Sequence, residues 1–178
     1  MSFSFADPAA NIKAFGLEPG MKIADLGAGS GAYALPAAEA VAPSGKVYVC
    51  EVQKDLLTRI RNDAAAKGIT NLEYLWTNVE KLGGTKLADG AVDGAIVSNV
   101  LFIVEDRHGF MSELKRIVKN SGRVFFIDWT DSFGGMGPHP DHVITQEKAE
   151  ALFKQFGFSP VRTIDTGPHH YGVIFKKD

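Results

Sequence analysis

The chain has 178 residues, of which 45% are hydrophobic and 22% charged, with a formal net charge of −2 at pH 7. This composition predicts one globular domain over residues 1–178 and excludes a bulk basic surface for nucleic acid. No apolar run approaches the roughly 20 residues that a membrane-spanning helix needs. The one cysteine, Cys50, excludes an internal disulfide and favours a cytoplasmic location.

Helix and strand patterns alternate through the first half of the chain. Asp7 and Pro8 are typical of a helix start and Gly16 of a helix end, so they bound a short helix. The β-branched and aromatic run KVYVCE predicts a strand. The elements predicted in this half are a helix over 7–16, a strand over 21–27, a helix over 32–42, a strand over 46–51, a helix over 52–67 and a strand over 71–78.

The second half continues the alternation but ends in two successive strands. The apolar run over 91–100 shows no alternation, which is typical of a parallel strand buried on both faces. The elements predicted here are a strand over 91–100, a helix over 106–119, a turn at 120–122, a strand over 123–130, an irregular loop over 131–143, a helix over 145–157 and strands over 159–166 and 169–177. A short Gly-Pro turn joins the last two strands, so they must run antiparallel.

This order predicts an α/β fold: a doubly wound, mostly parallel, seven-stranded Rossmann-like sheet with an antiparallel last strand and helices on both faces. Ligands of such sheets bind beyond the carboxyl ends of the strands. Five polar residues fall at or near five of these ends: Asp25, Glu51, Asn78, Asn99 and Asp128.

The stretch IADLGAGSGAY places glycines on alternate positions after the first predicted strand. Glycines in such a turn allow the backbone to approach a ligand closely. The dinucleotide fingerprint is G-x-G-x-x-G, whereas the spacing here is G-x-G-x-G with Asp25 two residues before it. A carboxylate at that place suits a positively charged ligand such as S-adenosylmethionine and opposes a pyrophosphate. Glu51 could accept hydrogen bonds from ribose hydroxyls in either cofactor.

The motifs resemble, in chain order, those of class I S-adenosylmethionine-dependent methyltransferases. DLGAGSG is similar to the first motif, KVYVCEV to the second and WTNVEKL to the adenine segment, while GAVDGAIVSNVLFIVED and LKRIVKNSGRVFFIDW resemble the segments around the fourth and fifth strands. The small type 11 branch, which includes quinone-biosynthesis methyltransferases, is the most similar subgroup.

The resemblance implies a set of residues that bind S-adenosylmethionine. These residues are Asp25, Gly27, Ala28, Gly29, Gly31, Glu51, Val52, Asn78, Val79 and Ser98. Family members more often have aspartate at position 78, and Asn78 still offers an acceptor oxygen. An alternative role for Gly31 is close packing of helix against strand.

The acceptor side is predicted from the loops after the fifth and sixth strands, which hold four of the five histidines. Histidine titrates near neutral pH, so we expect His139 or His142 to act as a general base and Asp128 to orient it. Solvent-exposed histidines, or a metal site, are the alternatives; no short zinc-binding spacing occurs, so no metal is expected. The residues expected to contact the acceptor are Asn99, Phe102, Trp129, His169 and His170, with further aromatics such as Phe3, Phe5, Phe133 and Tyr171 lining its pocket.

The sequence therefore predicts methyl transfer from S-adenosylmethionine to a small-molecule acceptor held at the ends of the fourth to sixth strands. A nicotinamide-dependent oxidoreductase and a non-catalytic S-adenosylmethionine-binding module remain alternatives. The single cysteine argues against the multi-cysteine site of arsenite methyltransferases. No nucleic-acid partner is expected, and a homodimer stays open.

Overall fold

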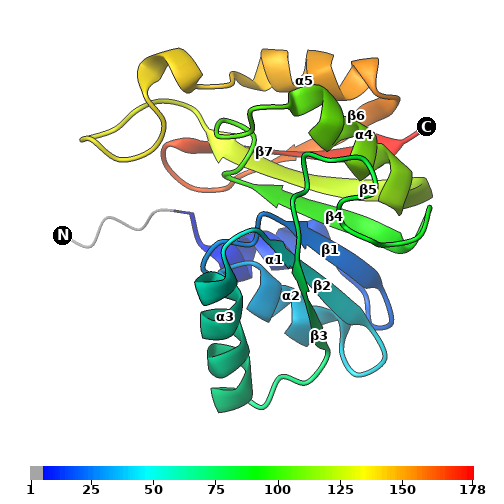
Figure 1. Ribbon diagram of the computed structural model, residues 1–178. Coiled ribbons are helices and arrows are strands. Elements are labelled where there is room, and N and C mark those ends of the chain that lie inside the picture. The colour runs from blue at the N-terminus through cyan, green and yellow to red at the C-terminus, as the bar shows by residue number, and fades with distance from the viewer. Residues whose placement is uncertain (1–5) are drawn as a thin grey trace.

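The computed structural model describes residues 6–178, so the predicted roles of Phe3 and Phe5 lie outside the described residues. Helices and strands alternate as the sequence predicts (Figure 1). The elements are α1 (Pro8–Phe15), β1 (Lys22–Leu26), α2 (Ala34–Val41), β2 (Lys46–Glu51), α3 (Lys54–Ala66), β3 (Leu72–Trp76), β4 (Val92–Ser98), α4 (Arg107–Ile117), β5 (Val118–Trp129), η1 (Pro140–His142), α5 (Gln146–Gln155), β6 (Phe158–Ile164) and β7 (His170–Lys177).

The strands form a seven-stranded sheet in the order β3-β2-β1-β4-β5-β7-β6. The pairs among β1 to β5 are parallel, and β7 runs antiparallel between β5 and β6. This arrangement confirms the predicted doubly wound sheet with an antiparallel last strand. The order reverses between β1 and β4, and ligands of open α/β sheets bind at such a switch point.

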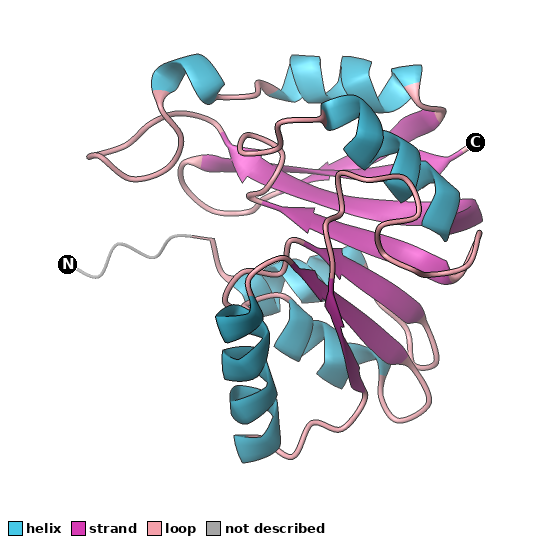
Figure 2. Ribbon diagram, in the orientation of Figure 1, coloured by secondary structure: helices cyan, strands magenta, loops and turns pink. Residues whose placement is uncertain are grey.

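Helices lie on both faces of the sheet (Figure 2). Buried apolar side chains form one cluster on each face. One cluster contains Phe110, Leu114 and Phe153, so α4 and α5 cover that face. The other contains Ile12 and Ile60 and lies under α1, α2 and α3. Burial on both faces explains why β4 reads as a continuous apolar run. The predicted helices on both faces are confirmed.

Capping residues set several helix ends, and those of α1 are as predicted. The side chain of Asp7 accepts hydrogen bonds from the Ala9 and Ala10 amides, and Gly16 ends α1 with φ +66°. Asp106 caps α4 by accepting from the Gly109 amide, and Thr145 caps α5. These contacts satisfy backbone donors that have no partner inside the helix.

The prediction for residues 106–130 needs one correction. The helix ends at Ile117, and β5 begins at Val118, before the predicted turn at 120–122. Val118 pairs with Val92, and the register then shifts so that Arg123 pairs with Gly94. The expected turn is therefore an irregularity within β5, because Val118 already pairs with β4 before the turn residues.

Among the described residues, no helix is long and apolar enough to cross a membrane.

Candidate active site

A cavity of about 500 Å³ lies at the carboxyl ends of β1, β2, β3 and β4. Pockets for small molecules and cofactors have volumes of this order. Eight of the ten residues predicted to bind the cofactor line it: Gly27, Ala28, Gly29, Glu51, Val52, Asn78, Val79 and Ser98. Ser98 and Asn99 complete its edge beside β4.

The glycine turn after β1 forms one wall of the cavity. The amides of Gly27 and Ala28 both donate to the carbonyl of Cys50, at 2.9 and 3.1 Å, which fixes the turn against β2. Gly27 has φ +76°, and a Cβ there would come within 2.6 Å of Val100 Cγ2. Gly29 has φ +55°, and a Cβ there would meet no described atom within 4 Å. The space over Gly29 therefore belongs to the cavity.

Gly31 has a different role from Gly29 in this structure. It does not line the cavity, and it is buried. A Cβ on Gly31 would come within 2.8 Å of Ile60 Cγ1 in α3, and its φ is +81°. The geometry therefore favours the packing role that the sequence left as the alternative.

Glu51, the last residue of β2, is buried and organises the turns around it. One carboxylate oxygen accepts from the Gly29 amide at 2.9 Å. The other accepts from the amides of Val52 and Gln53, at 2.9 and 3.0 Å. Each carboxylate oxygen has two lone pairs, so Glu51 retains acceptor capacity toward the cavity.

Asp25 lies beneath the glycine turn and is only 2% exposed, so it does not itself line the cavity. Its Oδ2 atom is buried and has no hydrogen-bond partner within residues 6–178. Burial, followed by repulsion from Glu51, raises the pKa of Asp25 to about 7. A positive charge or an N–H donor near this edge would stabilise the ionised form of Asp25.

The segments that follow β2, β3 and β4 form the apolar part of the cavity. Val52 and Ile103 line it although they are 60% and 62% exposed. Asn78 is exposed at the rim, and its Oδ1 atom accepts from the Glu80 amide at 2.9 Å. The second lone pair of that oxygen is available to a ligand.

Sequence reasoning missed several residues of the cavity wall. They are Ser30, Ala32, Tyr33, Gln53, Leu56, Thr77 and Glu80. All of them lie within five residues of a predicted motif residue. Tyr33 is buried, and its hydroxyl accepts from Asn11 Nδ2 at 3.0 Å, so α1 helps to hold this wall. Their nearness to the motifs was a signal that could have found them. The place of Leu56 in the wall also depends on how α3 packs on the sheet.

A second group of polar atoms lies at the carboxyl ends of β4 and β5. Asn99 has φ +53°, and its amide donates to the carbonyl of Ile127 at 2.9 Å. Asp128 is 1% exposed, and its Oδ1 atom accepts from the Trp129 amide at 2.8 Å. Neither Asn99 Oδ1 nor Asp128 Oδ2 has a hydrogen-bond partner in the described part of the chain.

The environment of Asp128 favours its neutral form. Burial raises the pKa of Asp128 to about 7, against the opposing effects of the Trp129 amide and of Arg107. On the neighbouring strand, Asp128 pairs with Tyr171, whose hydroxyl donates to the Ile144 carbonyl at 2.7 Å. Asp128 does not line the cavity, so it lies beyond the cofactor-side residues on the β5 side of the sheet.

Of the two histidine-containing loops, the start of the first contacts the second, and the later part of the first does not share these contacts. His169 Nδ1 lies 3.0 Å from an oxygen of Asp131, and its ring stacks on Phe133 at 4.0 Å. The His170 ring lies 4.2 Å from that of Trp129, and burial lowers the pKa of His170. The segments around 129–133 and 169–170 therefore share one rim.

His139 and His142 have other neighbours. Their rings lie 6.1 Å apart, and His139 Nδ1 is 3.3 Å from Asp141. Both are exposed and lie outside the cavity lining, as do Phe102, Trp129, His169 and His170. No group of three or more His, Cys, Asp or Glu residues among positions 6–178 is placed to hold a metal ion.

Comparison with known proteins identifies the family. Residues 24–126, more than half of the chain, match the family model described as a methyltransferase domain. An arsenite methyltransferase from Halobacterium salinarum is 27% identical over 134 residues, which are 75% of this chain and 32% of that protein. The ubiquinone/menaquinone biosynthesis C-methyltransferase UbiE from Haemophilus ducreyi is 25% identical over 120 residues, which are 67% of this chain and 45% of that protein.

These matches span less than half the length of the curated relatives. Among solved structures, a SAM-dependent methyltransferase from Aquifex aeolicus superposes with a TM-score of 0.87 and 27% identity, over 98% of this chain and 91% of that one. The match therefore extends beyond the segment around the glycine turn to the whole sheet. The chain belongs to the methyltransferase domain family, type 11, and has the fold of an S-adenosylmethionine-dependent methyltransferase.

Proposed function

We propose that this protein transfers a methyl group from S-adenosylmethionine to a small-molecule acceptor held at the carboxyl ends of β4, β5 and β6. The observation that carries the proposal is the cavity beside the glycine turn, with buried Asp25 beneath it and Glu51 in its wall. Two carboxylates at adjacent strand ends favour a ligand with positive charge. S-adenosylmethionine has a sulfonium and an ammonium group, whereas a dinucleotide would place a pyrophosphate near both acids.

The residues present fit S-adenosylmethionine along the length of the cavity. The unpartnered Oδ2 atom of Asp25 supports recognition of the charged methionine end. Glu51 has acceptor capacity for ribose hydroxyls, and the apolar wall at Val52 and Ile103 suits the adenine ring, with Asn78 at its rim. Open space over Gly29 allows the ligand to approach the backbone. When bound, S-adenosylmethionine supplies a methyl group activated by the sulfonium.

The chain's contribution to methyl transfer is to orient the acceptor and to take up its proton. Holding reacting groups in a productive orientation is worth up to roughly 7–11 kcal/mol in well-oriented systems. Asp128 is a buried carboxylate with an unpartnered oxygen, next to Asn99 on the neighbouring strand end. A pKa of about 7 allows Asp128 to accept a proton from a hydroxyl or an acidic carbon of the acceptor near neutral pH.

This assignment moves the general base from the predicted His139 or His142 to Asp128. The reason is burial, because both histidines are exposed and Asp128 is enclosed at a strand end. A role for either histidine in proton transfer stays a prediction. The contacts of Trp129 with His170 and of Phe133 with His169 support an aromatic rim for the acceptor.

The test has a binding stage and a turnover stage. Calorimetry with the wild-type protein should give tighter binding of S-adenosylhomocysteine than of NADH; the reverse order would favour the nicotinamide-dependent alternative. An acceptor panel is then screened by release of S-adenosylhomocysteine, and no turnover on any acceptor would favour a non-catalytic binding module. Sedimentation velocity of the same preparation tests the homodimer.

With an acceptor identified, Asp128→Asn separates proton transfer from binding. The amide cannot accept a proton, so turnover should fall roughly 10²- to 10⁴-fold while S-adenosylhomocysteine affinity changes little. His139→Ala and His142→Ala serve as matched variants at exposed positions. A large loss in either histidine variant, with Asp128→Asn fully active, would return the base to the histidine loop.

A further inference from the structure

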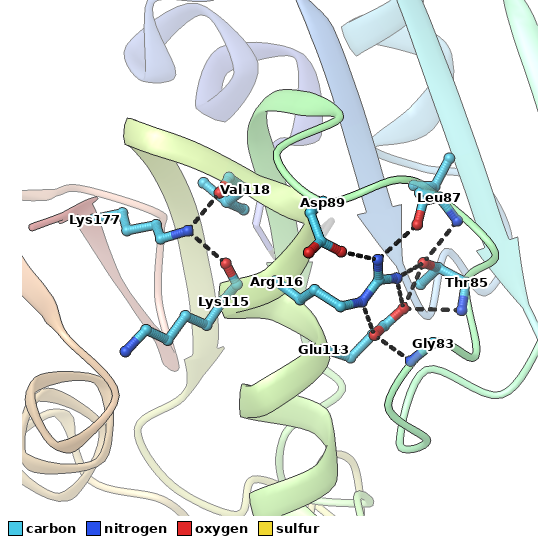
Figure 3. A network of polar contacts seen from close by, with 9 residues as sticks. All are labelled: Gly83, Thr85, Leu87, Asp89, Glu113, Lys115, Arg116, Val118 and Lys177. Atoms are coloured by element: carbon cyan, nitrogen blue, oxygen red, sulfur yellow. Dashed lines mark hydrogen bonds and ion pairs between the residues drawn. The ribbon is translucent and has the colours of Figure 1, made fainter.

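A buried glutamate on α4 holds the loop that joins β3 to β4 (Figure 3). The side chain of Glu113 is 0% exposed. One oxygen accepts from the Gly83 amide at 2.7 Å and from Arg116 Nε at 2.9 Å. The other accepts from the amide and hydroxyl of Thr85, at 3.0 and 2.5 Å, and from Arg116 Nη2 at 2.8 Å. The carboxylate thus accepts five hydrogen bonds, three from the loop and two from Arg116.

Arg116 extends the same network along the loop. Its Nη1 atom donates to the Leu87 carbonyl at 2.7 Å and to Asp89 at 2.8 Å. Burial by itself would raise the pKa of Glu113, but hydrogen bonds from Arg116, Thr85 and Gly83 lower it to about 2. Glu113 is therefore ionised at neutral pH, and its charge is compensated by Arg116 and by the neutral donors of the loop that it holds.

The loop segment held by Glu113 packs directly against the adenine-side residues of the cavity. Gly84 lies between the two residues that bond to Glu113, and its carbonyl accepts from the Thr77 hydroxyl. A Cβ on Gly84 would overlap the carbonyl oxygen of Asn78. Thr77 and Asn78 both line the cavity. A shift of residues 83–85 must therefore move Thr77 and Asn78.

The start of α4 holds the other end of the same segment. Glu80 lines the cavity, and its side chain accepts from the Asp106 amide at 2.7 Å. Gly109 packs so closely on the Glu80 carbonyl that a Cβ would overlap that oxygen. Residues 77–80 are thus clamped to α4 at both ends, by Glu80 at the start of the helix and by Glu113 through residues 83–85.

We propose that Glu113, together with Arg116, is a positioning residue for cofactor binding: it holds the loop after β3 in the conformation that presents Thr77–Glu80 to the cavity. Glu113 acts through the loop and lines no part of the cavity itself. The inference rests on the proposed cofactor site. It predicts that cofactor affinity depends on a side chain whose hydrogen bonds are all with the loop and with its own helix.

The test is Glu113→Gln, measured by calorimetry with S-adenosylhomocysteine and by thermal unfolding. Glutamine keeps the shape but points an amide donor at the donors of Gly83, Thr85 or Arg116. The apparent dissociation constant rises in inverse proportion to the fraction of molecules with a competent loop. We expect binding of S-adenosylhomocysteine to weaken about 5- to 10-fold. Turnover at saturating S-adenosylmethionine should stay within about twofold of wild type. Amide hydrogen exchange over residues 77–90 should become faster.

A matched control separates positioning from general stability. Phe175→Leu weakens the hydrophobic core on the α4 and α5 face of the sheet, where the Phe175 ring stacks on Phe153 at 4.0 Å, and leaves the hydrogen bonds of Glu113 in place. Its unfolding temperature should fall while its S-adenosylhomocysteine affinity and the exchange over 77–90 stay unchanged. Thr85→Val removes the hydroxyl bond to Glu113 together with the longer bonds that this hydroxyl accepts from the Leu87 amide and from Arg116. It should weaken binding in the same direction and serves if Glu113→Gln does not fold.

Unchanged affinity in folded Glu113→Gln or Thr85→Val, or an equal loss in Phe175→Leu, would overturn the inference. Failure of the wild type to bind S-adenosylhomocysteine would instead overturn the proposed function. The hydrogen-exchange comparison needs no ligand, so in that case it would still decide whether Glu113 holds the loop.

Discussion

Replacing Glu51 by glutamine tests the centre of the cofactor site with the smallest change of shape. The carboxylate accepts three backbone hydrogen bonds, from Gly29 at 2.9 Å and from Val52 and Gln53 at 2.9 and 3.0 Å. A glutamine can keep its oxygen toward Val52 and Gln53, which places its amide group against the Gly29 N–H. Two donors then face one another, and Gly29 loses its bond to the end of β2, while Gly27 and Ala28 keep theirs to the Cys50 carbonyl.

The magnitude follows from the bonds that are lost. A hydrogen bond to a charged group contributes about 1.5–3 kcal/mol, and Glu51 is only 6% exposed, so solvent does not replace it well. The substitution also removes the acceptor proposed for the ribose hydroxyls. We therefore expect binding of S-adenosylhomocysteine to weaken by about 1.5–3 kcal/mol, which is roughly a 10- to 150-fold rise in Kd.

Isothermal titration calorimetry with S-adenosylhomocysteine measures this change directly. The matched control is Glu73→Gln on β3, which removes a half-exposed ion pair with Lys46 of β2, outside the cavity lining. The control should leave the dissociation constant unchanged within about twofold, because exposed ion pairs contribute little. A folded Glu51→Gln variant with wild-type affinity would refute the reasoning and remove Glu51 from the site.

Two further predictions concern the glycines and the buried aspartate. Gly29→Val should abolish cofactor binding, because its side chain would stand in the cavity, and should also lower the unfolding temperature, because φ is +55° at this position. Gly31→Ala should lower the unfolding temperature through its contact with Ile60 and affect binding less. Calorimetry of both variants measures the contrast in affinity, and equal losses of affinity would contradict it. Burial raises the pKa of Asp128 to about 7, so the folded state binds the proton more tightly than the unfolded chain and stability falls as pH rises from about 4 to about 7. Asp128→Asn should reduce this fall by at most about 4 kcal/mol in urea unfolding across that range, and an unchanged pH profile would show that Asp128 titrates normally.

The sequence alone was enough to predict the order and type of the elements. Caps such as Asp7 and Gly16, and the β-branched run of β2, are local signals that act within a few residues. The glycine turn and the acid at the end of β2 also belong to one short βαβ unit, so the main cofactor residues could be read from spacing. The start of β5 at Val118 could not, because it depends on pairing with Val92 across the sheet.

Only the tertiary structure decided which residues share a site. Gly29 and Gly31 are two positions apart and both have positive φ, yet one faces a cavity and the other faces Ile60 of α3. His139 and Asp128 are both polar residues near the carboxyl end of β5, yet one is exposed and the other is 1% exposed with an unpartnered oxygen. Glu113 reads as one more charge on an amphipathic helix, and its role emerges only where the loop after β3 folds onto it. Local sequence determines backbone conformation, whereas burial and partners depend on segments that packing brings together from distant parts of the chain.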